Sequence, residues 1–360
     1  MHIPDGYLSP STCGIFYGLA VAGWYSALKH VKRVLSHRTI PLISVFAAFS
    51  FVVMMFNLPL PGGTTGHAVG VTVAAIVLGP WGSILAISIA LAMQALFFGD
   101  GGITTLGANA FNIAMVGSIV TWSVYKLVSA GSLITSRRRV LAAAIAGYAA
   151  VNASALVTAL EFGIQPLLFH DQHGVPLYSP YPLHIAVPAM MIGHLTVAGL
   201  AEGAISAGMV SYFQRTDPGL LKGLSSHSYA QASRAVAVKQ LSVPRLWLLV
   251  ALLMLLTPLG ILAVGTAWGE WSSADLADPA TRQHIAVTSR GVAPPASAPQ
   301  GLQRLSTIWT APFPAYAPPF VKNAAFGYLL SAMFGVGLLA LAAFGVESAR
   351  VRRTTSEAHR

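Results

Sequence analysis

The sequence predicts an all-α fold, a polytopic membrane helix bundle, and three observations support this class. Hydrophobic residues make up 55% of the 360 and charged residues only 9%, whereas a soluble domain carries about 25% charged residues. Apolar runs of the length that crosses a bilayer, about 17–25 residues, recur along the chain. The net charge of +10 comes from basic clusters between these runs. This pattern is typical of the positive-inside rule and argues against nucleic acid as a partner.

The apolar runs predict the individual membrane spans. The clear candidates are residues 11–29, 39–58, 105–128, 139–161, 183–213, 245–265 and 324–346. The run at 67–98 is also apolar, but Gly79-Pro80-Trp81-Gly82 interrupts it.

Charge decides how the interrupted run is threaded. Basic clusters at 29–38 and 137–139 place both of their loops on the cytoplasmic side. Residues 67–98 then begin and end outside, so they must cross an even number of times. We expect a hairpin with its turn at Gly79-Pro80. Its short first limb rises only about 20 Å at 1.5 Å per residue and should be packed inside protein.

These spans divide the chain into a larger and a smaller membrane part, with the N-terminus outside and the C-terminus cytoplasmic. The predicted units are a seven-helix domain at 1–213, a cytoplasmic linker at 214–244, a two-helix part at 245–346 and a cytoplasmic tail at 347–360. The external loop of the two-helix part, about 266–322, contains "GVAPPASAP" and "APFPAYAPP". Proline this dense predicts extended, poorly helical backbone there.

The first residues, "MHIPDGYLSP", lack the basic start and the cleavage site of a secretory signal. They contain a chelating pattern instead. The Met1 amine, the His2 backbone nitrogen and the His2 Nδ1 close a five- and a six-membered ring on one ion, with the three donors in one plane. Tetragonal nitrogen sites suit Ni(II) or Cu(II), and low-spin Co(II) is also plausible. One corner of the plane stays empty.

His67 is the candidate for the empty corner. It lies in "PGGTTGHAVG", on the same predicted side of the membrane as Met1. Gly62, Gly63 and Gly66 permit a tight loop that approaches a ligand closely. A histidine at a helix start is more often a solvated or hydrogen-bonding residue, but the conjunction with the free terminus favours a metal site.

Three segments together, "MHIPDGYLSP", "PGGTTGHAVG" and "FFGDGGITTLGANAFNIAMVG", resemble the CbiM/NikM family. Its members are substrate-binding membrane components of energy-coupling-factor ABC transporters for cobalt and nickel. The resemblance covers about 1–213 and implies seven helices. It also implies metal binding by the Met1 amine, by the His2 amide and imidazole, and by His67.

The resemblance also implies the partners and the setting. Residues 245–346 are similar, chiefly in topology, to the small CbiN/NikN component, which the family requires for metal loading or transport. A CbiQ/NikQ-like transmembrane coupling subunit and CbiO/NikO-like cytoplasmic ATPases would complete the transporter in a prokaryotic inner membrane. The chain would then be no enzyme and would hold no cofactor beyond the transported Ni(II) or Co(II).

For several other polar residues we expect a structural role and not metal binding. His170 and His173 have metal-ligand spacing, but we expect a solvated loop. Asp100 is expected in a turn beside the metal loop. Asn109 and Asn112 are expected to make helix–helix hydrogen bonds.

Two carboxylates and two small-residue stripes complete the candidates. Glu161 should lie near the outer end of its span, within reach of water, whereas Glu202 lies deeper and is either functional or bonded to a neighbouring helix. Small residues recur every fourth position at Gly14, Gly18 and Ala22, and again at Gly199, Gly203 and Ala207. They predict close helix packing, either within the chain or against the coupling subunit.

Two rival functions stay open on sequence alone. A stand-alone ion-coupled divalent-metal permease would need a membrane carboxylate pathway, for which Glu202 is the candidate. An intramembrane metalloenzyme would need an open coordination position, which a filled four-nitrogen plane does not offer. No Gly-x-x-x-x-Gly-Lys-[Ser/Thr] run occurs, so the chain has no P-loop of its own.

Overall fold

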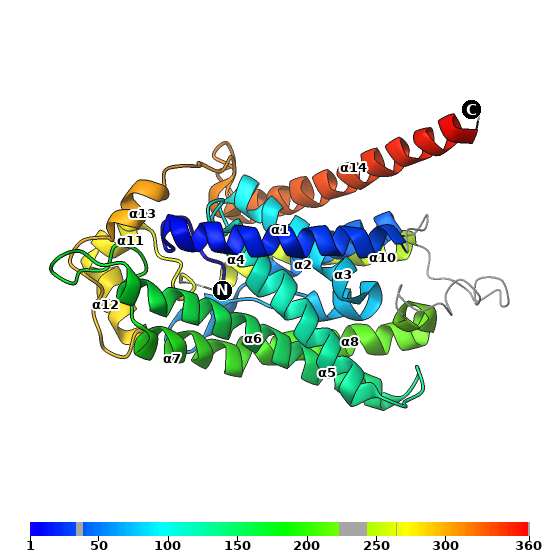
Figure 1. Ribbon diagram of the computed structural model, residues 1–360, viewed down its shortest axis with the longest axis horizontal. Helices are drawn as coiled ribbons and strands as arrows, with labels where there is room; N and C mark the ends of the chain where they lie inside the picture. The colour runs from blue at the N-terminus through cyan, green and yellow to red at the C-terminus, as the bar shows by residue number, and fades with distance from the viewer. Residues whose placement is uncertain (34–38, 223–242, 264, 359–360) are drawn as a thin grey trace.

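The computed structural model describes residues 1–33, 39–222, 243–263 and 265–358, and it shows a bundle of long helices lying side by side (Figure 1). Within these residues, six helices are long and apolar enough to cross a membrane. They are Val71–Phe98, Leu106–Ser129, Arg137–Leu168, Leu183–Thr216, Val243–Leu262 and Ala324–Ala349. The protein is therefore a multi-pass helical membrane protein, and the division into seven and two helices stays a prediction.

The elements of the larger part follow the predicted runs closely. They are α1 (Pro10–Arg33), α2 (Thr39–Met54), β1 (Leu58–Leu60), β2 (Thr64–Gly66), α3 (Val71–Met93), η1 (Gln94–Phe98), α4 (Leu106–Asn109), η2 (Ala110–Val116), α5 (Gly117–Ser129), α6 (Arg137–Leu168), α7 (Leu183–Gly193), η3 (His194–Ala198), α8 (Gly199–Thr216) and η4 (Pro218–Lys222). The η1, η2 and η3 elements are π-helical turns that continue the helices beside them.

The smaller part has two long helices and a structured loop between them. Its elements are α10 (Val243–Leu256), η5 (Thr257–Leu262), α11 (Ser273–Ala277), α12 (Pro279–Thr288), α13 (Gln300–Leu305), η6 (Pro314–Tyr316) and α14 (Ala324–Ala358). Both α10 and α14 pack against α2, so the smaller part lies along one side of the larger one.

The interrupted run folds back on itself as predicted. Gly79 has φ 74° and ψ 170°, a conformation that glycine adopts at little cost, and Pro80 follows it. The Ser83 hydroxyl donates to the Val71 carbonyl at 3.4 Å, although twelve residues of straight helix would separate them by about 18 Å. Residues 71–79 are all buried, so the short limb is packed inside protein.

A small β-hairpin shortens the second predicted span. We expected it to reach residue 58, but α2 ends at Met54, and β1 then pairs antiparallel with β2, with Leu58 opposite Gly66. The turn between the strands contains Gly62 and Gly63, both at positive φ, the conformation that tight hairpin turns require. The predicted glycine-framed loop is therefore a two-stranded ribbon that leads directly to His67.

The loop between α10 and α14 is more helical than predicted. The proline stretches at 291–299 and 311–319 contain no α-helix, but α11 and α12 form before the first stretch and α13 forms between the two. Local capping explains this, because Ser272 and Asp275 make a reciprocal capping box and Asp278 caps a helix that begins with Pro279. These helices gather beside the start of α1 and the α6–α7 loop (Figure 1).

The predicted linker and tail lie partly in helices. Within the linker, α8 continues to Thr216 and η4 follows it, while 223–242 lie outside the described residues. The tail is continuous with α14, which runs on to Ala358.

Candidate metal site

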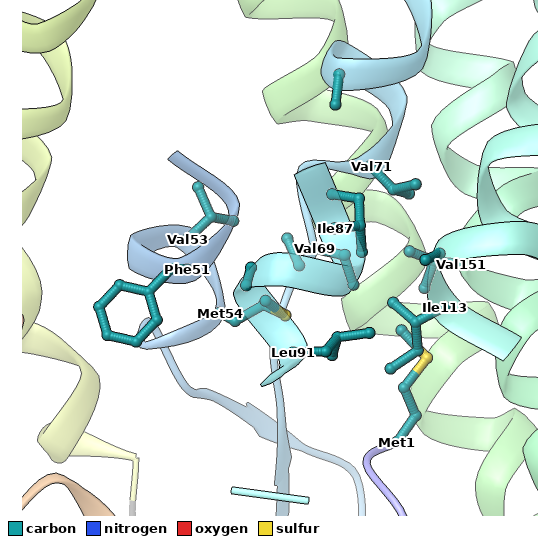
Figure 2. Packing of buried hydrophobic residues seen from close by; sticks show 14 of the residues in the cluster. Met1, Phe51, Val53, Met54, Val69, Val71, Ile87, Leu91, Ile113 and Val151 are labelled. Atoms are coloured by element: carbon teal, nitrogen blue, oxygen red, sulfur yellow. The ribbon is translucent and has the colours of Figure 1, made fainter. Parts of the chain in front are cut away.

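The N-terminal segment is buried, although a chain end is usually poorly ordered and exposed. Met1, His2 and Ile3 are 3%, 1% and 0% exposed. Figure 2 shows the Met1 side chain pointing toward Ile113, in the same core cluster as Leu91 and Val151. The side chain of the first residue therefore fills part of the protein core.

Polar groups from distant elements fix this segment in place. Asn109 Oδ1 accepts from the Ile3 amide at 2.8 Å, and Asn109 Nδ2 donates to the Ile3 carbonyl at 3.1 Å. Asp5 accepts from the amides of Ile103 and Thr104 at 3.1 and 2.7 Å. The prediction for Asn109 was therefore wrong, because this amide binds the main chain of the terminus and makes no helix–helix bond.

Gln165 also binds the segment, and sequence reasoning missed it. Its Oε1 accepts from the Ser9 amide at 2.9 Å. Asn112 behaves as predicted and donates to Thr158 and Glu161 on α6 at 3.2 and 2.9 Å.

The structure brings the imidazoles of His2 and His67 together. Their ring centroids are 5.0 Å apart and the ring planes differ by 27°. His2 Nε2 has no hydrogen-bond partner among the described residues, and His2 Nδ1 faces the Asp100 carboxylate at 2.8 Å. Buried polar atoms are normally hydrogen-bonded, so the unpartnered nitrogen and the nearby carboxylate together indicate a place for a cationic ligand.

His67 is held in a form that can donate a lone pair. It lies between β2 and α3, and its Nδ1 is 3.0 Å from the Ala68 carbonyl. This contact assigns the ring hydrogen to Nδ1 and leaves Nε2 as a base. Burial, followed by the positive charges of His2 and the terminus, lowers the pKa of His67 to about 3. The ring is therefore neutral at physiological pH.

The ring separation fits neighbouring corners of a square plane. A ring nitrogen binds a metal at about 2 Å, which puts each ring centroid ~3 Å from the ion. Two rings at adjacent corners would then be ~4.5 Å apart, and rings at opposite corners ~6 Å. In the terminal chelate the empty corner is adjacent to the His2 ring, which agrees with the observed 5.0 Å.

Two carboxylates lie against this donor set. Glu270 Oε1 is 3.0 Å from the Met1 amine nitrogen. Asp100 Oδ1 is 2.8 Å from His2 Nδ1, the ring nitrogen that would close the terminal chelate. Burial raises the pKa of Asp100, and the nearby His2 and His67 outweigh it, so the net pKa lies below its usual range. Both carboxylates would lower the energy of a divalent cation here.

The smaller part of the chain supplies much of this surrounding shell. Glu270 belongs to the α10–α14 loop, and Tyr316 from the same loop donates to Asp100 Oδ2 at 2.6 Å. Tyr7 donates to the Trp271 carbonyl at 2.7 Å, and Thr65 of β2 pairs with Ala267. Nothing in the sequence distinguishes Glu270 from the loop carboxylates that cap helices, so sequence reasoning missed it.

The second predicted histidine pair lies apart from the buried site. His170 and His173 are exposed, and Asp171 between them accepts from the amides of His173 and Val175 at 2.8 Å. These bonds are those of a local turn, as expected for a solvated loop. In the described part of the chain, no group of three or more His, Cys, Asp or Glu side chains is arranged to hold a metal, so a site at the terminus depends on main-chain nitrogens.

The two membrane carboxylates, Glu161 and Glu202, differ in their partners, and only Glu161 departs from its predicted surroundings. Glu161 is buried, not in reach of water as predicted, and Asn112 donates to its carboxylate. Glu202 accepts from the amides of Val69, Gly70 and Thr72. It is thus bonded to a neighbouring helix, the blander of the two expectations.

The two small-residue stripes differ in whether they pack within the chain. Gly14, Gly18 and Ala22 on α1 are exposed, and no atom lies near a side chain built at either glycine. A Cβ built on Gly203 would instead lie 3.0 Å from the Ala144 carbonyl oxygen of α6. Packing within the chain therefore explains the stripe on α8 and not the stripe on α1.

Comparison with known families agrees with this geometry. Residues 2–220 match the model of the CbiM family, described as the cobalt uptake substrate-specific transmembrane region. The chain belongs to the CbiM family. Residues 243–352 match the PDGLE domain, so this CbiM-family chain carries a fused C-terminal part like that of its relatives.

The most similar relatives include two fused proteins. The fused nickel transport protein NikMN of Rhodobacter capsulatus is 51% identical over 358 residues, covering 99% of this chain and 100% of the relative. The probable fused nickel transport protein LarMN of Lactiplantibacillus plantarum is 39% identical and covers 96% and 98%. CbiM-family proteins are components of metal transporters and not enzymes.

Solved structures resemble the larger part of the chain. A crystal structure of a transition metal transporter is 44% identical, with a TM-score of 0.58, covering 66% of this chain and 100% of that one. A truncated transition metal transporter is 47% identical, with a TM-score of 0.57, covering 60% and 99%.

Proposed function

We propose that this CbiM-family chain captures Ni(II) or Co(II) through four nitrogens in one plane. The donors are the Met1 amine, the His2 amide and Nδ1, and the His67 Nε2. The ion is the cargo, and no further cofactor is required. The observation that carries the proposal is the stacked pair of buried imidazoles, 5.0 Å apart, beside a buried chain terminus.

The proposed setting is an energy-coupling-factor ABC transporter of a prokaryotic inner membrane. The absence of a P-loop from the sequence supports separate CbiO/NikO-like ATPases. The exposed small-residue stripe on α1 offers a face where a CbiQ/NikQ-like coupling subunit could approach closely. The basic clusters support an external N-terminus and a cytoplasmic C-terminus.

The proposed division of labour follows the predicted units. Residues 1–213 supply the four nitrogens, and residues 245–346 act as the fused small component. Support comes from Glu270 and Tyr316, which reach the Met1 amine and Asp100 from the loop of the smaller part.

A stand-alone ion-coupled permease is the less well supported function. It needs a carboxylate free to exchange ions, yet three main-chain amides occupy Glu202. A metalloenzyme would need an open metal position, and four nitrogens fill the proposed plane.

Two measurements test the proposal. Purified protein should bind one Ni(II), with the spectrum of a diamagnetic square-planar complex. Cells expressing the chain should accumulate metal only with active ATPase subunits. A paramagnetic octahedral nickel spectrum would exclude the four-nitrogen plane, and full uptake without the ATPases would favour the permease.

A further inference from the structure

The Glu202 carboxylate accepts hydrogen bonds from three main-chain amides. It is fully buried on α8, and its Oε2 accepts from the amides of Val69 and Gly70 at 2.7 and 2.8 Å. Its Oε1 lies 3.3 Å from the amide of Thr72. The donors lie 130–133 residues away in sequence, so this bond set joins two separate elements.

The three amides surround the first turn of α3, which begins at Val71. Amides at a helix start have no partner within the helix, and the helix dipole there favours an anion. Among the described residues, Glu202 makes no ion pair with a basic side chain. The main chain at the start of α3 is thus what compensates its burial.

The same stretch of main chain carries His67. The ring Nδ1 of His67 bonds the Ala68 carbonyl, and the next amide, that of Val69, is the one Glu202 holds at 2.7 Å. The Ser50 hydroxyl donates to the Val69 carbonyl at 2.5 Å. The Ala68 carbonyl orients the His67 ring. The residue that follows it, Val69, is held by Glu202 of α8 and Ser50 of α2, so this carbonyl is fixed in place.

We propose that Glu202 is a positioning residue for the metal site, holding the 68–72 main chain so that His67 presents Nε2 to the ion. This inference rests on the proposed function, because His67 must be a ligand for its position to affect binding. Glu202 touches no proposed donor atom and acts only on the fourth corner of the plane.

Glu202→Gln is the direct variant. Its amide retains one oxygen acceptor, but its NH₂ group then faces a main-chain amide and the negative charge is lost. We expect Ni(II) affinity, measured by calorimetry, to fall about 10–100-fold, as for other partners that orient a metal ligand. Glu161→Gln is the matched control, because Glu161 is also buried but bonds the Asn112 side chain; it should leave affinity unchanged.

A double variant separates positioning from general damage. If Glu202 acts through His67, Glu202→Gln should cause no further loss of affinity in a His67→Ala background, because interacting sites are not additive. The nickel spectrum of the single variant Glu202→Gln should also shift toward the spectrum of His67→Ala. Unchanged affinity in Glu202→Gln, or full additivity with His67→Ala, would overturn the inference.

Failure of the inference can be distinguished from failure of the proposed function. If His67→Ala itself binds Ni(II) normally, both fall. If His67→Ala loses affinity and Glu202→Gln does not, only the inference falls. Should Glu202→Gln fail to fold, Glu202→Asp keeps the carboxylate on a shorter side chain, and the same two criteria apply to it.

Discussion

Two histidine pairs of the chain differ in burial and in how their positions are fixed. His170 and His173 stand three residues apart, the spacing of many metal sites, but they are exposed and their turn is made by Asp171. His2 and His67 stand 65 positions apart, yet their rings stack in the protein interior.

The difference supports the buried pair as the proposed metal site, because a rigid frame holds its members and ligand spacing alone does not provide one. Both members of the buried pair are tied down by distant groups: the segment after His2 by Asn109, and the segment after His67 by Glu202. The exposed pair has local turn bonds only. A preorganised site needs ligands whose own positions are fixed by their surroundings.

The largest expected effect comes from adding one residue before Met1. The extension would turn the Met1 amine into an amide. It would also place an extra residue beside Met1, which is only 3% exposed and has little free space around it. Ni(II) affinity should fall by more than the ~10–100-fold typical of losing an outer-shell partner. Calorimetry on the purified variant checks this, and unchanged affinity would exclude the terminal chelate.

Substitution of single histidines compares the two pairs directly. His67→Ala should lose tight metal binding while thermal unfolding in detergent stays cooperative. His170→Ala and His173→Ala are the matched controls and should change uptake little. Normal transport by His67→Ala combined with failure of the loop variants would reverse the assignment of the pairs.

Acidification should weaken the buried site steeply. Nitrogen donors must lose protons before they bind metal, so affinity should fall from neutral pH to pH 5, and binding should release protons into the buffer. His67 contributes little to this fall, because its pKa of about 3 keeps it neutral throughout. A flat affinity from pH 8 to 5 would indicate oxygen ligands.

The lowered pKa of His67 also predicts a pH dependence of stability. Between an ordinary value near 6.5 and about 3, the unfolded chain binds a proton that the folded chain does not. The free energy of unfolding of the metal-free protein should therefore fall as pH drops through this window. His67→Ala should make the dependence shallower, and an identical slope in both proteins would contradict the assignment.

The smallest expected effect lies in the surrounding shell. Tyr316→Phe removes the donor to Asp100 Oδ2 at 2.6 Å but leaves all four nitrogens, so affinity should fall ~10-fold or less. Tyr148→Phe is the control, since this exposed hydroxyl donates to the Leu195 carbonyl. A larger loss than that of His67→Ala would mean that Asp100 contributes directly to metal binding.

Sequence predicted those features that local physics determines. The lengths of the apolar runs predicted the long helices. The basic clusters placed both ends of residues 67–98 on the same side of the membrane, which requires an even number of crossings and so predicted the fold-back at Gly79. The chelate of Met1 and His2 can be proposed from sequence because it depends on two adjacent residues, and it stays a prediction.

Features that depend on distant partners could not be read this way. In the sequence, Glu270 cannot be distinguished from the other carboxylates of its loop, and only the fold brings it to the Met1 amine. Asn109 carries no sign that its partner is Ile3 rather than another helix. The average composition of the proline-rich loop predicts extended backbone, whereas capping residues at 272 and 278 create two helices before its proline stretches.

The burial of the N-terminal segment has a consequence for how the protein is made. Met1 and its partner Glu270 are 269 residues apart in sequence, and Gly6 lies against the main chain of Leu302. Asn109 and Gln165 can hold the terminal segment once the larger part has folded, but the Glu270 contact must wait for the smaller part. The surroundings of the proposed site are therefore completed late in biogenesis, after its four donor nitrogens are already in the chain.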